Sequence, residues 1–195
     1  MMLRGDRSHW GALAQGFHWI IAVLILVQGT IGLVMVQLPK RPDVIPVYNL
    51  HKSIGLTILA LAVLRLAWRA FDRRPLDPPD MPTWQHRVSR LTHIALYVLI
   101  FAVPLSGWLF DSASSLRPLH WWGLLRIPSL TGGPAPAWKA FSQDLHETLF
   151  WVLFAVAALH VAAALKHHWF DRDDVLRRML PPMRRRAPPP EENVP

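Results

Sequence analysis

The sequence predicts an all-α membrane protein, an antiparallel bundle of four transmembrane helices. Hydrophobic residues make up 52% of its 195 residues, and charged residues only 17%. The charged residues collect between four apolar stretches of about 20 residues each, the length of helix that crosses about 30 Å of hydrocarbon. Four crossings return the chain to the side from which it started, so both termini are expected on the same side.

We expect the spans at residues 17–36, 50–68, 91–110 and 145–165. The first apolar stretch is too long for the core of a signal peptide and no small-residue cleavage site follows it, so it is expected to stay as a transmembrane helix. Residues 1–180 are expected to form one domain. Residues 181–195 are rich in proline, arginine and glutamate and predict a disordered tail.

The distribution of positive charge predicts the orientation. Fifteen lysines and arginines fall on the side of the termini and the middle loop, and six fall on the other side. An excess of this kind marks the cytoplasmic side, so both termini are expected in the cytoplasm. The arginine-rich tail suits anionic lipid headgroups better than nucleic acid, despite the net charge of +8. The fifteen are Arg4, Arg7, Arg65, Arg69, Arg73, Arg74, Arg87, Arg90, Lys166, Arg172, Arg177, Arg178, Arg184, Arg185 and Arg186.

Two loops have a distinctive composition. Residues 72–85 are rich in proline, which forbids continuous helix and predicts a stiff connector. The loop at 111–144 is the longest and contains the aromatic and apolar stretch HWWGLLRI at 120–127. This stretch is expected to lie at the membrane surface.

Four histidines lie in the apolar stretches at depths that match in pairs. His18 and His51 lie near the starts of the first and second stretches, and His146 and His160 share the last. The 14-residue step between His146 and His160 corresponds to about 21 Å of helix rise and about four turns. Two imidazoles on one helix face, about two-thirds of a bilayer apart, suit two stacked haems better than a single metal centre.

The predicted topology narrows the pairing without completing it. His51 and His146 both lie near the outer rim, whereas His160 lies about 9 Å from the inner end of its helix. Its partner is either His18 or His93, and the residues alone favour His18 only slightly. Two facing imidazoles would give a six-coordinate iron suited to electron transfer. For a single isolated histidine, a hydrogen bond between helices is an equally good explanation.

The absence of cysteine restricts the cofactor. It excludes a disulfide, a covalently attached c-type haem and a thiolate-held iron–sulfur cluster. No glycine-rich dinucleotide motif or P-loop is present either. For a protein that handles electrons, histidine-ligated haem b is the remaining cofactor.

Several motifs occur along most of the chain, over residues 11–180. They are HW at 18–19, NLHKSIG at 49–55, RLAWR at 65–69, the loop from Pro79 to Gln85, His93 with Tyr97, PLSGW at 104–108, HET at 146–148 and LHVAAALKHH at 159–168. Together they resemble the bacterial cytochrome b561 family, the four-helix dihaem b cytochromes of the inner membrane.

The resemblance implies a location in a bacterial inner membrane. It also implies that His18 pairs with His160 on an inner haem, that His51 pairs with His146 on an outer one, and that His93 is not an axial ligand.

The resemblance implies two alternative functions. One is a self-contained oxidoreductase that takes electrons from superoxide at the periplasmic face and reduces ubiquinone. The other is a cytochrome b subunit that relays electrons from a periplasmic dehydrogenase or hydrogenase to quinone. The outer basic residues outnumber the acidic ones and would attract a small anion, which favours superoxide. The basic residues are Lys40, Arg41, Lys52, Arg117, Arg126 and Lys139, and the acidic ones are Asp43, Asp111, Asp144 and Glu147.

A quinone site is expected near the inner membrane surface. His167 follows His160 by seven residues, about 10 Å nearer the cytoplasm on the same helix face. With Arg65 or Arg69 it is the candidate partner for a quinone carbonyl, the alternative being an interfacial belt. Arg65 could also pair with a haem propionate or snorkel to the membrane surface. The proline-rich loop is a candidate lid, although its acidic Asp77 and Asp80 depart from the lysine typical of the family.

Overall fold

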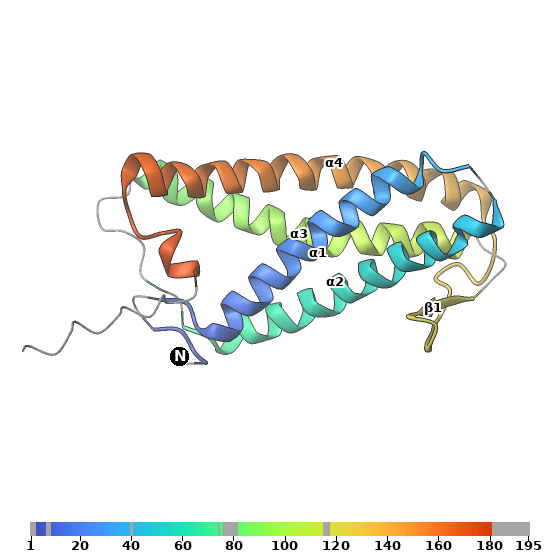
Figure 1. The fold of residues 1–195 in the computed structure, drawn as a ribbon, viewed down its shortest axis with the longest axis horizontal. Helices are drawn as coiled ribbons and strands as arrows, with labels where there is room; N and C mark the ends of the chain where they lie inside the picture. Colours follow the sequence, from blue (N-terminus) through green and yellow to red (C-terminus); the bar gives the residue numbers. More distant parts are fainter. Residues whose placement is uncertain are drawn as a thin grey trace, which may run out of the picture.

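Four long helices dominate the computed structural model, which describes residues 3–6, 9–39, 41–73, 75, 82–114 and 118–180 (Figure 1). They are α1 (Ala12–Met35), α2 (Ile45–Phe71), α3 (Thr83–Ser114) and α4 (Pro136–Lys166). All four are long and apolar enough to cross a membrane, which confirms the predicted number of spans. Each is longer than the apolar stretch that predicted it: α2, α3 and α4 extend beyond the stretch at both ends, whereas α1 begins five residues earlier and ends one residue earlier.

Short elements flank the helices. A 3-10 turn (Pro42–Val44) precedes α2, a π-helical turn (His167–Asp171) continues α4, and a second 3-10 turn (Arg177–Met179) follows. In the proline-rich connector, residues 74 and 76–81 lie outside the described residues, so the predicted lid with Asp77 and Asp80 does too. The predicted disordered tail at 181–195 also lies outside them.

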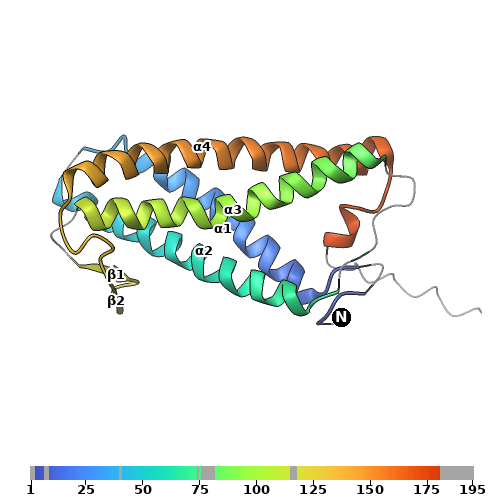
Figure 2. The same ribbon diagram turned by 180° about the vertical axis from the view of Figure 1, so that it is seen from behind.

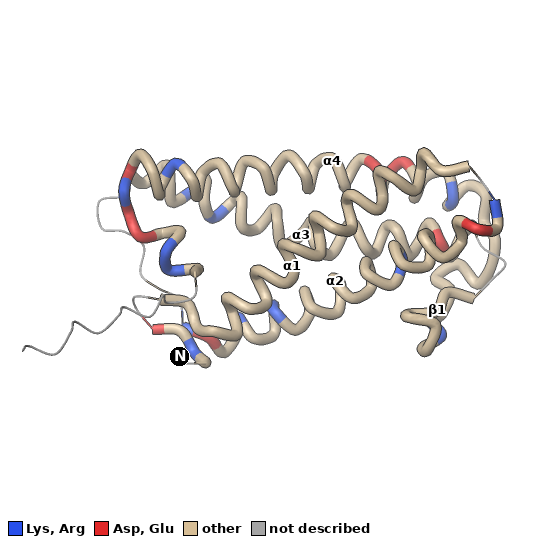
Figure 3. Tube along the Cα trace, in the orientation of Figure 1, with Lys and Arg blue, Asp and Glu red and all other residues tan. Residues whose placement is uncertain are grey.

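The helices pack in sequence order, α1 on α2, α2 on α3 and, most extensively, α3 on α4 (Figures 1 and 2). Two apolar clusters form the core at mid-height. One contains Ala62, Leu99, Ile100 and Leu153, and the other contains Ile21, Ile54 and Ile58. Large apolar side chains on the outer surface of the helices are exposed, and charged residues gather at the two ends of the bundle (Figure 3). This is the surface expected of a bundle that faces lipid.

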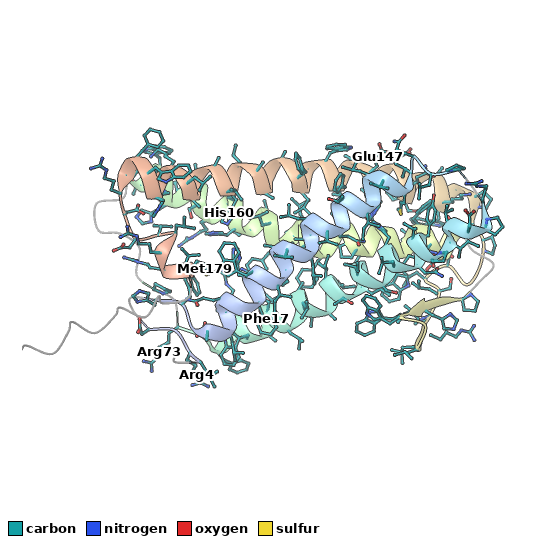
Figure 4. All side chains as sticks on the ribbon, in the orientation of Figure 1. Arg4, Phe17, Arg73, Glu147, His160 and Met179 are labelled. Carbon is teal, nitrogen blue, oxygen red and sulfur yellow. The ribbon has the colours of Figure 1, made fainter. Side chains whose placement is uncertain are left out.

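Segments from both ends of the chain close one end of the bundle. The Trp19 indole N–H donates to the Met179 carbonyl at 2.9 Å, and the Gln15 amide donates to the Arg178 carbonyl at 3.2 Å. The Gly5 N–H donates to Asp72 Oδ1 at 2.8 Å, next to the end of α2. Arg4, Arg73 and Met179 therefore lie together, at the opposite end from Glu147 (Figure 4). We call the end with Arg4 and Met179 the inner end and the other the outer end.

The outer loop contains a small β-hairpin that the sequence analysis did not predict. Strands β1 (Leu119–Trp121) and β2 (Leu125–Ile127) pair antiparallel around Trp122 and Gly123, which have φ of 54° and 73°. Two consecutive positive φ values and the bond from Leu124 N–H to the Trp121 carbonyl define a type I′ turn. The bulky Trp122 is unusual in this conformation, which is why the pattern did not indicate a hairpin.

The hairpin is fixed to the outer half of α2. The Trp122 N–H donates to Ser53 Oγ at 3.1 Å. The indole N–H groups of Trp121 and Trp122 both donate to Thr57 Oγ1, at 3.0 and 3.1 Å. The aromatic stretch is therefore held against a transmembrane helix by polar contacts.

An ion pair joins α2 to α3 at the same end. Lys52 Nζ lies 2.6 Å from Asp111 Oδ1, and the side chains of Lys52 and Asp111 are 32% and 9% exposed. Because Asp111 is nearly buried, removing Lys52 would leave its carboxylate without the charge that compensates for its burial.

We predict that Lys52→Met lowers the free energy of unfolding by about 2 kcal/mol, the worth of a hydrogen bond to a charged group. Thermal unfolding of the purified protein in detergent measures this loss. Replacing Asp111 by leucine in the same chain should recover much of the stability, because no buried charge then remains unpaired. Arg41→Met is the matched control: Arg41 pairs with Asp43 at 3.7 Å in an exposed position, and its loss should change little. Equal losses in both single variants would contradict this account.

Candidate functional site

Four histidines form two pairs inside the bundle, one toward each end. The ring centroids of His51 on α2 and His146 on α4 lie 6.3 Å apart. Those of His18 on α1 and His160 on α4 are also 6.3 Å apart. We call these the outer pair and the inner pair; His160 lies toward the end that carries Arg4 and Met179 (Figure 4). The structure thus brings together all four histidines singled out from the sequence.

The separation within each pair suits a metal ion between the rings. An imidazole nitrogen lies about 1.1 Å from the ring centroid and binds a metal at about 2.0 Å, so two rings that face each other across one ion have centroids about 6.2 Å apart. Both pairs match this separation. His93 on α3 lies closer to His160, at 5.3 Å, which is too short for ligation from opposite sides of one ion.

The outer pair is held by a polar group of contacts on α3. His146 Nδ1 lies 2.9 Å from the Val103 carbonyl and 3.0 Å from Ser106 Oγ. A carbonyl only accepts, so Nδ1 carries the hydrogen and Nε2 keeps its lone pair. The Ser106 hydroxyl itself donates to the Val103 carbonyl at 2.7 Å. Metal-bound histidines typically donate their second N–H in this way.

Two glycines, which have no side chain, leave room for the outer pair. A Cβ at Gly107 would lie 3.0 Å from His146 Cε1, and a Cβ at Gly32 would lie 3.2 Å from His51 Cε1. His51 Nδ1 is buried and has no hydrogen-bond partner among the described residues. A buried imidazole nitrogen without a partner is costly, and a metal ion bound at that nitrogen would supply one. The donor set and its surroundings therefore fit a histidine-ligated haem.

Arginine and tyrosine surround the inner pair. Arg65 Nη2 lies 3.2 Å from His18 Nδ1, and the guanidinium groups of Arg65 and Arg69 lie 5.4 and 4.8 Å from the centre of the Tyr97 ring. Arg65 is therefore turned into the bundle rather than toward the membrane surface. A guanidinium only donates, so His18 accepts through Nδ1 in this structure. Metal binding through His18 Nε2 would require Arg65 to release that nitrogen.

The contacts of the His167 side chain are with carboxylates and not with Arg65 or Arg69. Its Nδ1 is 2.6 Å from Asp173 Oδ2 and 3.2 Å from Asp171 Oδ2. Lys166 Nζ also binds Asp171, at 2.6 Å from Oδ2. The π-helical turn His167–Asp171 and the left-handed Arg172 (φ 55°) bring Asp173 back toward the imidazole. His167, which the sequence predicted to bind quinone, thus forms an imidazole–carboxylate pair with Asp173.

Comparison with known proteins identifies the family. The model of the family "Prokaryotic cytochrome b561" matches residues 9–182. The chain belongs to this family. It is 34% identical to "Cytochrome b561 homolog 2" of Escherichia coli (strain K12) over 91% of this chain and 94% of that protein. It is 28% identical to "Cytochrome b561 homolog 1" of the same organism over 82% of this chain and 89% of that protein.

The cytochrome is accordingly a membrane electron-transfer protein of the oxidoreductase type, in a family that binds haem b. This confirms the recognised family and the helical membrane fold predicted from the sequence.

Some residues at the site were not assigned a role from the sequence. Ser106 and Gly107 belong to a motif noted only as part of the resemblance, and Tyr97 was noted in the same way. A signal was available for Ser106 and Gly107, because both follow Pro104 in the middle of a transmembrane helix. A proline there leaves a backbone carbonyl without its usual partner and often marks a functional position.

We predict that Gly107→Ala lowers the haem content of the cytochrome, because the added Cβ would lie 3.0 Å from His146 Cε1 and displace the ring. Haem per chain, measured by pyridine haemochrome, provides the test. Gly16→Ala is the matched control: Gly16 is also helical, and a Cβ there meets no atom within 4 Å. That variant should keep its haem and gain up to about 1 kcal/mol of stability from its higher helix propensity. Full haem content in Gly107→Ala would rule out the close approach.

Proposed function

We propose that this cytochrome holds two b haems and passes electrons from a periplasmic donor to the ubiquinone pool. His51 and His146 are the axial ligands of the outer haem, and His18 and His160 those of the inner one. The observation that carries the proposal is the equal 6.3 Å separation of the two histidine pairs, at opposite ends of one bundle. The excess of basic residues on the side of the termini supports a cytoplasmic inner end in a bacterial inner membrane.

A haem with two histidine ligands supplies one-electron transfer at its edge, without an open position for a substrate. The residues of this chain hold it and fix its ligands. Val103 and Ser106 orient the His146 ring, and Gly32 and Gly107 leave space for the outer pair. At the inner pair, Arg65 would leave His18 Nδ1 and remain beside Tyr97 as a positive charge.

Superoxide is the donor we favour. Arg126 and Lys139 form no ion pair among the described residues, so their charges face the outer solution without a local counterion. Arg41 and Lys52 are paired with Asp43 and Asp111, which weakens their pull on an anion. Asp144 and Glu147 balance Arg126 and Lys139 in number, so the net excess of two positive charges comes from Lys40 and Arg117, which lie outside the described residues.

A subunit that receives electrons from a partner protein is the second candidate. The observation in its favour is the tip of the outer hairpin, where Leu124 is 89% exposed beside the half-exposed Trp122 and Leu125. Exposed apolar residues on a rigid hairpin suit a protein partner or the membrane surface. The partner would be a periplasmic dehydrogenase or hydrogenase.

We predict two b haems per chain. His51→Ala and His146→Ala should each remove only the outer haem, and His18→Ala and His160→Ala only the inner one. His93→Ala is the matched control and should keep both, since its ring stands too close to His160 to share an ion with it. Pyridine haemochrome and optical spectra of the purified variants measure this. Loss of a haem in His93→Ala, with none lost in His18→Ala, would assign the inner ligands differently.

Superoxide should reduce the cytochrome quickly at low ionic strength and markedly more slowly at high salt, because salt screens the attraction between the anion and the outer basic residues. Stopped-flow absorption of the oxidised protein mixed with superoxide measures the rate. The double variant Arg126→Gln, Lys139→Gln should lose much of this salt dependence. A slow reaction that is insensitive to salt would favour the partner-protein alternative.

The quinone site is proposed at the inner end, with His167, Arg65 and Arg69 as candidate residues. With hydrogen on both ring nitrogens, as in the imidazolium, His167 would donate through Nδ1 to Asp173 and through Nε2 to a quinone carbonyl. The arginines present donors near Tyr97 and the inner pair. Carbonyl oxygens accept hydrogen bonds from both kinds of group.

His167→Ala should lower the rate of ubiquinol formation at least tenfold while both haems remain bound and reducible, because the imidazole contacts quinone and not iron. Steady-state quinone reduction with a chemical reductant measures this rate. His168→Ala is the neighbouring control and should reduce quinone at close to the original rate. Unchanged turnover in His167→Ala would remove His167 from the quinone site.

A further inference from the structure

We propose that His167, Asp171 and Asp173 form a binding site for a divalent metal ion of the zinc class at the inner end of the bundle. The site is separate from the two histidine pairs and does not depend on the proposed function. Acidic and basic residues lie close together where the chain leaves α4 (Figure 3). Among the residues that the structure describes, these three are the one group of metal-ligating side chains whose ligand atoms all lie within 4.8 Å of one another.

The three side chains supply one imidazole nitrogen and two carboxylate oxygens. His167 Nδ1 lies 3.2 Å from Asp171 Oδ2 and 2.6 Å from Asp173 Oδ2. Ligands about 2.1 Å from a tetrahedral zinc ion stand about 3.4 Å apart, so the first separation already fits and the second needs Asp173 to move back by less than about 1 Å. One imidazole and two carboxylates leave a fourth position for water, as in open zinc sites.

The backbone at the end of α4 places these ligands. His167 and Asp171 lie about one turn apart in the π-helical turn that continues the helix. The left-handed Arg172 then reverses the chain, and the Asp173 N–H donates to the His167 carbonyl at 3.1 Å. Asp173 Oδ1 accepts from the Val175 N–H at 3.0 Å, which leaves Oδ2 on the side of the imidazole. Hydrogen bonds of this kind also hold the ligating carboxylates of metal sites in place.

The charge and exposure of the group suit a divalent cation. Its two carboxylates carry two negative charges. The side chains of His167, Asp171 and Asp173 are 16%, 32% and 21% exposed, so they are partly shielded from water but can be reached from solution. Lys166 Nζ contacts Asp171 Oδ1 at 2.8 Å and Oδ2 at 2.6 Å. The lysine thus supplies one positive charge, and a metal ion would displace it from Oδ2.

An ion at this site would join two parts of the inner end. His167 continues α4, whereas Asp173 belongs to the segment 172–180, which accepts hydrogen bonds from Gln15 and Trp19 of α1. The ion would therefore connect α4 with α1 through this segment. It would also replace hydrogen on His167 Nδ1, so the neutral ring would carry its hydrogen on Nε2 and keep a donor on the opposite side.

Zinc titration of the full-length, haem-loaded protein tests the site. The protein is prepared without a histidine tag and is treated with a chelator that leaves the haem iron in place. Calorimetry and elemental analysis should show one tightly bound zinc ion per chain, and the temperature of unfolding should rise when zinc is bound. Magnesium at the same concentration should not displace zinc, because an imidazole ligand suits zinc better than magnesium.

Asp173→Asn should weaken zinc binding at least about tenfold, because it removes a charged ligand. The amide oxygen that replaces Oδ1 can still accept from the Val175 N–H. Asp171→Asn should weaken zinc binding in the same way. Asp174→Asn is the matched control: it removes the same charge from the next residue, where the carboxylate is 63% exposed and pairs with Arg177 at 3.5 Å. This variant should bind zinc as tightly as the unmodified protein.

Lys166→Gln tests the site in the opposite direction. It removes the ammonium group that contacts Asp171, so zinc should bind more tightly. Arg177→Gln removes a positive charge that pairs with Asp174 instead, and it should change the affinity less.

The absence of bound zinc, or an unchanged affinity in both Asp171→Asn and Asp173→Asn, would overturn this inference, as would equal displacement by magnesium. The three side chains would then form an ion-pair cluster only. The haem spectrum of each variant verifies its fold. The number of haems per chain, counted in the same samples, tests the proposed function separately.

Discussion

The arrangement of this bundle depends on the cost of leaving an imidazole without a partner in hydrocarbon. Four histidines point into the interior, and each pair joins helices that are not consecutive in the chain: α2 with α4 at the outer end, and α1 with α4 at the inner end. α4 packs most extensively on α3, and its His146 also bonds to Val103 and Ser106 of that helix. The histidine pairs add links from α4 to α1 and α2 to the packing between helices that are neighbours in the chain.

The spans and the placement of two histidines on one face of α4 could be predicted from the sequence, because they depend on length and periodicity. Apolar stretches of membrane length indicated the helices, and the 14-residue step from His146 to His160 placed two histidines on one face. The choice between His18 and His93 could not be made from depth, since both lie near the inner end. It depends on lateral placement, and the ring separations of 6.3 Å from His160 to His18 and 5.3 Å to His93 support the proposed pairing with His18.

Other features depend on contacts between distant residues and could not be predicted. The pairing of Lys52 with Asp111 brings together residues on two helices, although both were counted from the sequence as separate outer charges. The sequence allowed Arg65 to be a membrane anchor, whereas in the structure its side chain contacts His18 of the inner pair. Asp173 reaches His167 only because the chain leaves α4 through a π-helical turn and a left-handed arginine, neither of which has a reliable sequence signature.

The apolar core between the two histidine pairs has an energetic consequence for the cell. Ala62, Leu99, Ile100 and Leu153 form an apolar layer in the middle of the bundle. On the proposed route, an inward electron would cross this layer without an accompanying proton. The step spans about two-thirds of the membrane and moves negative charge toward the negative side of an energised membrane. It therefore costs about 1.5 kcal/mol for each 100 mV of membrane potential. On the proposed route, the membrane potential itself opposes inward electron flow, and collapse of that potential would make this flow more favourable.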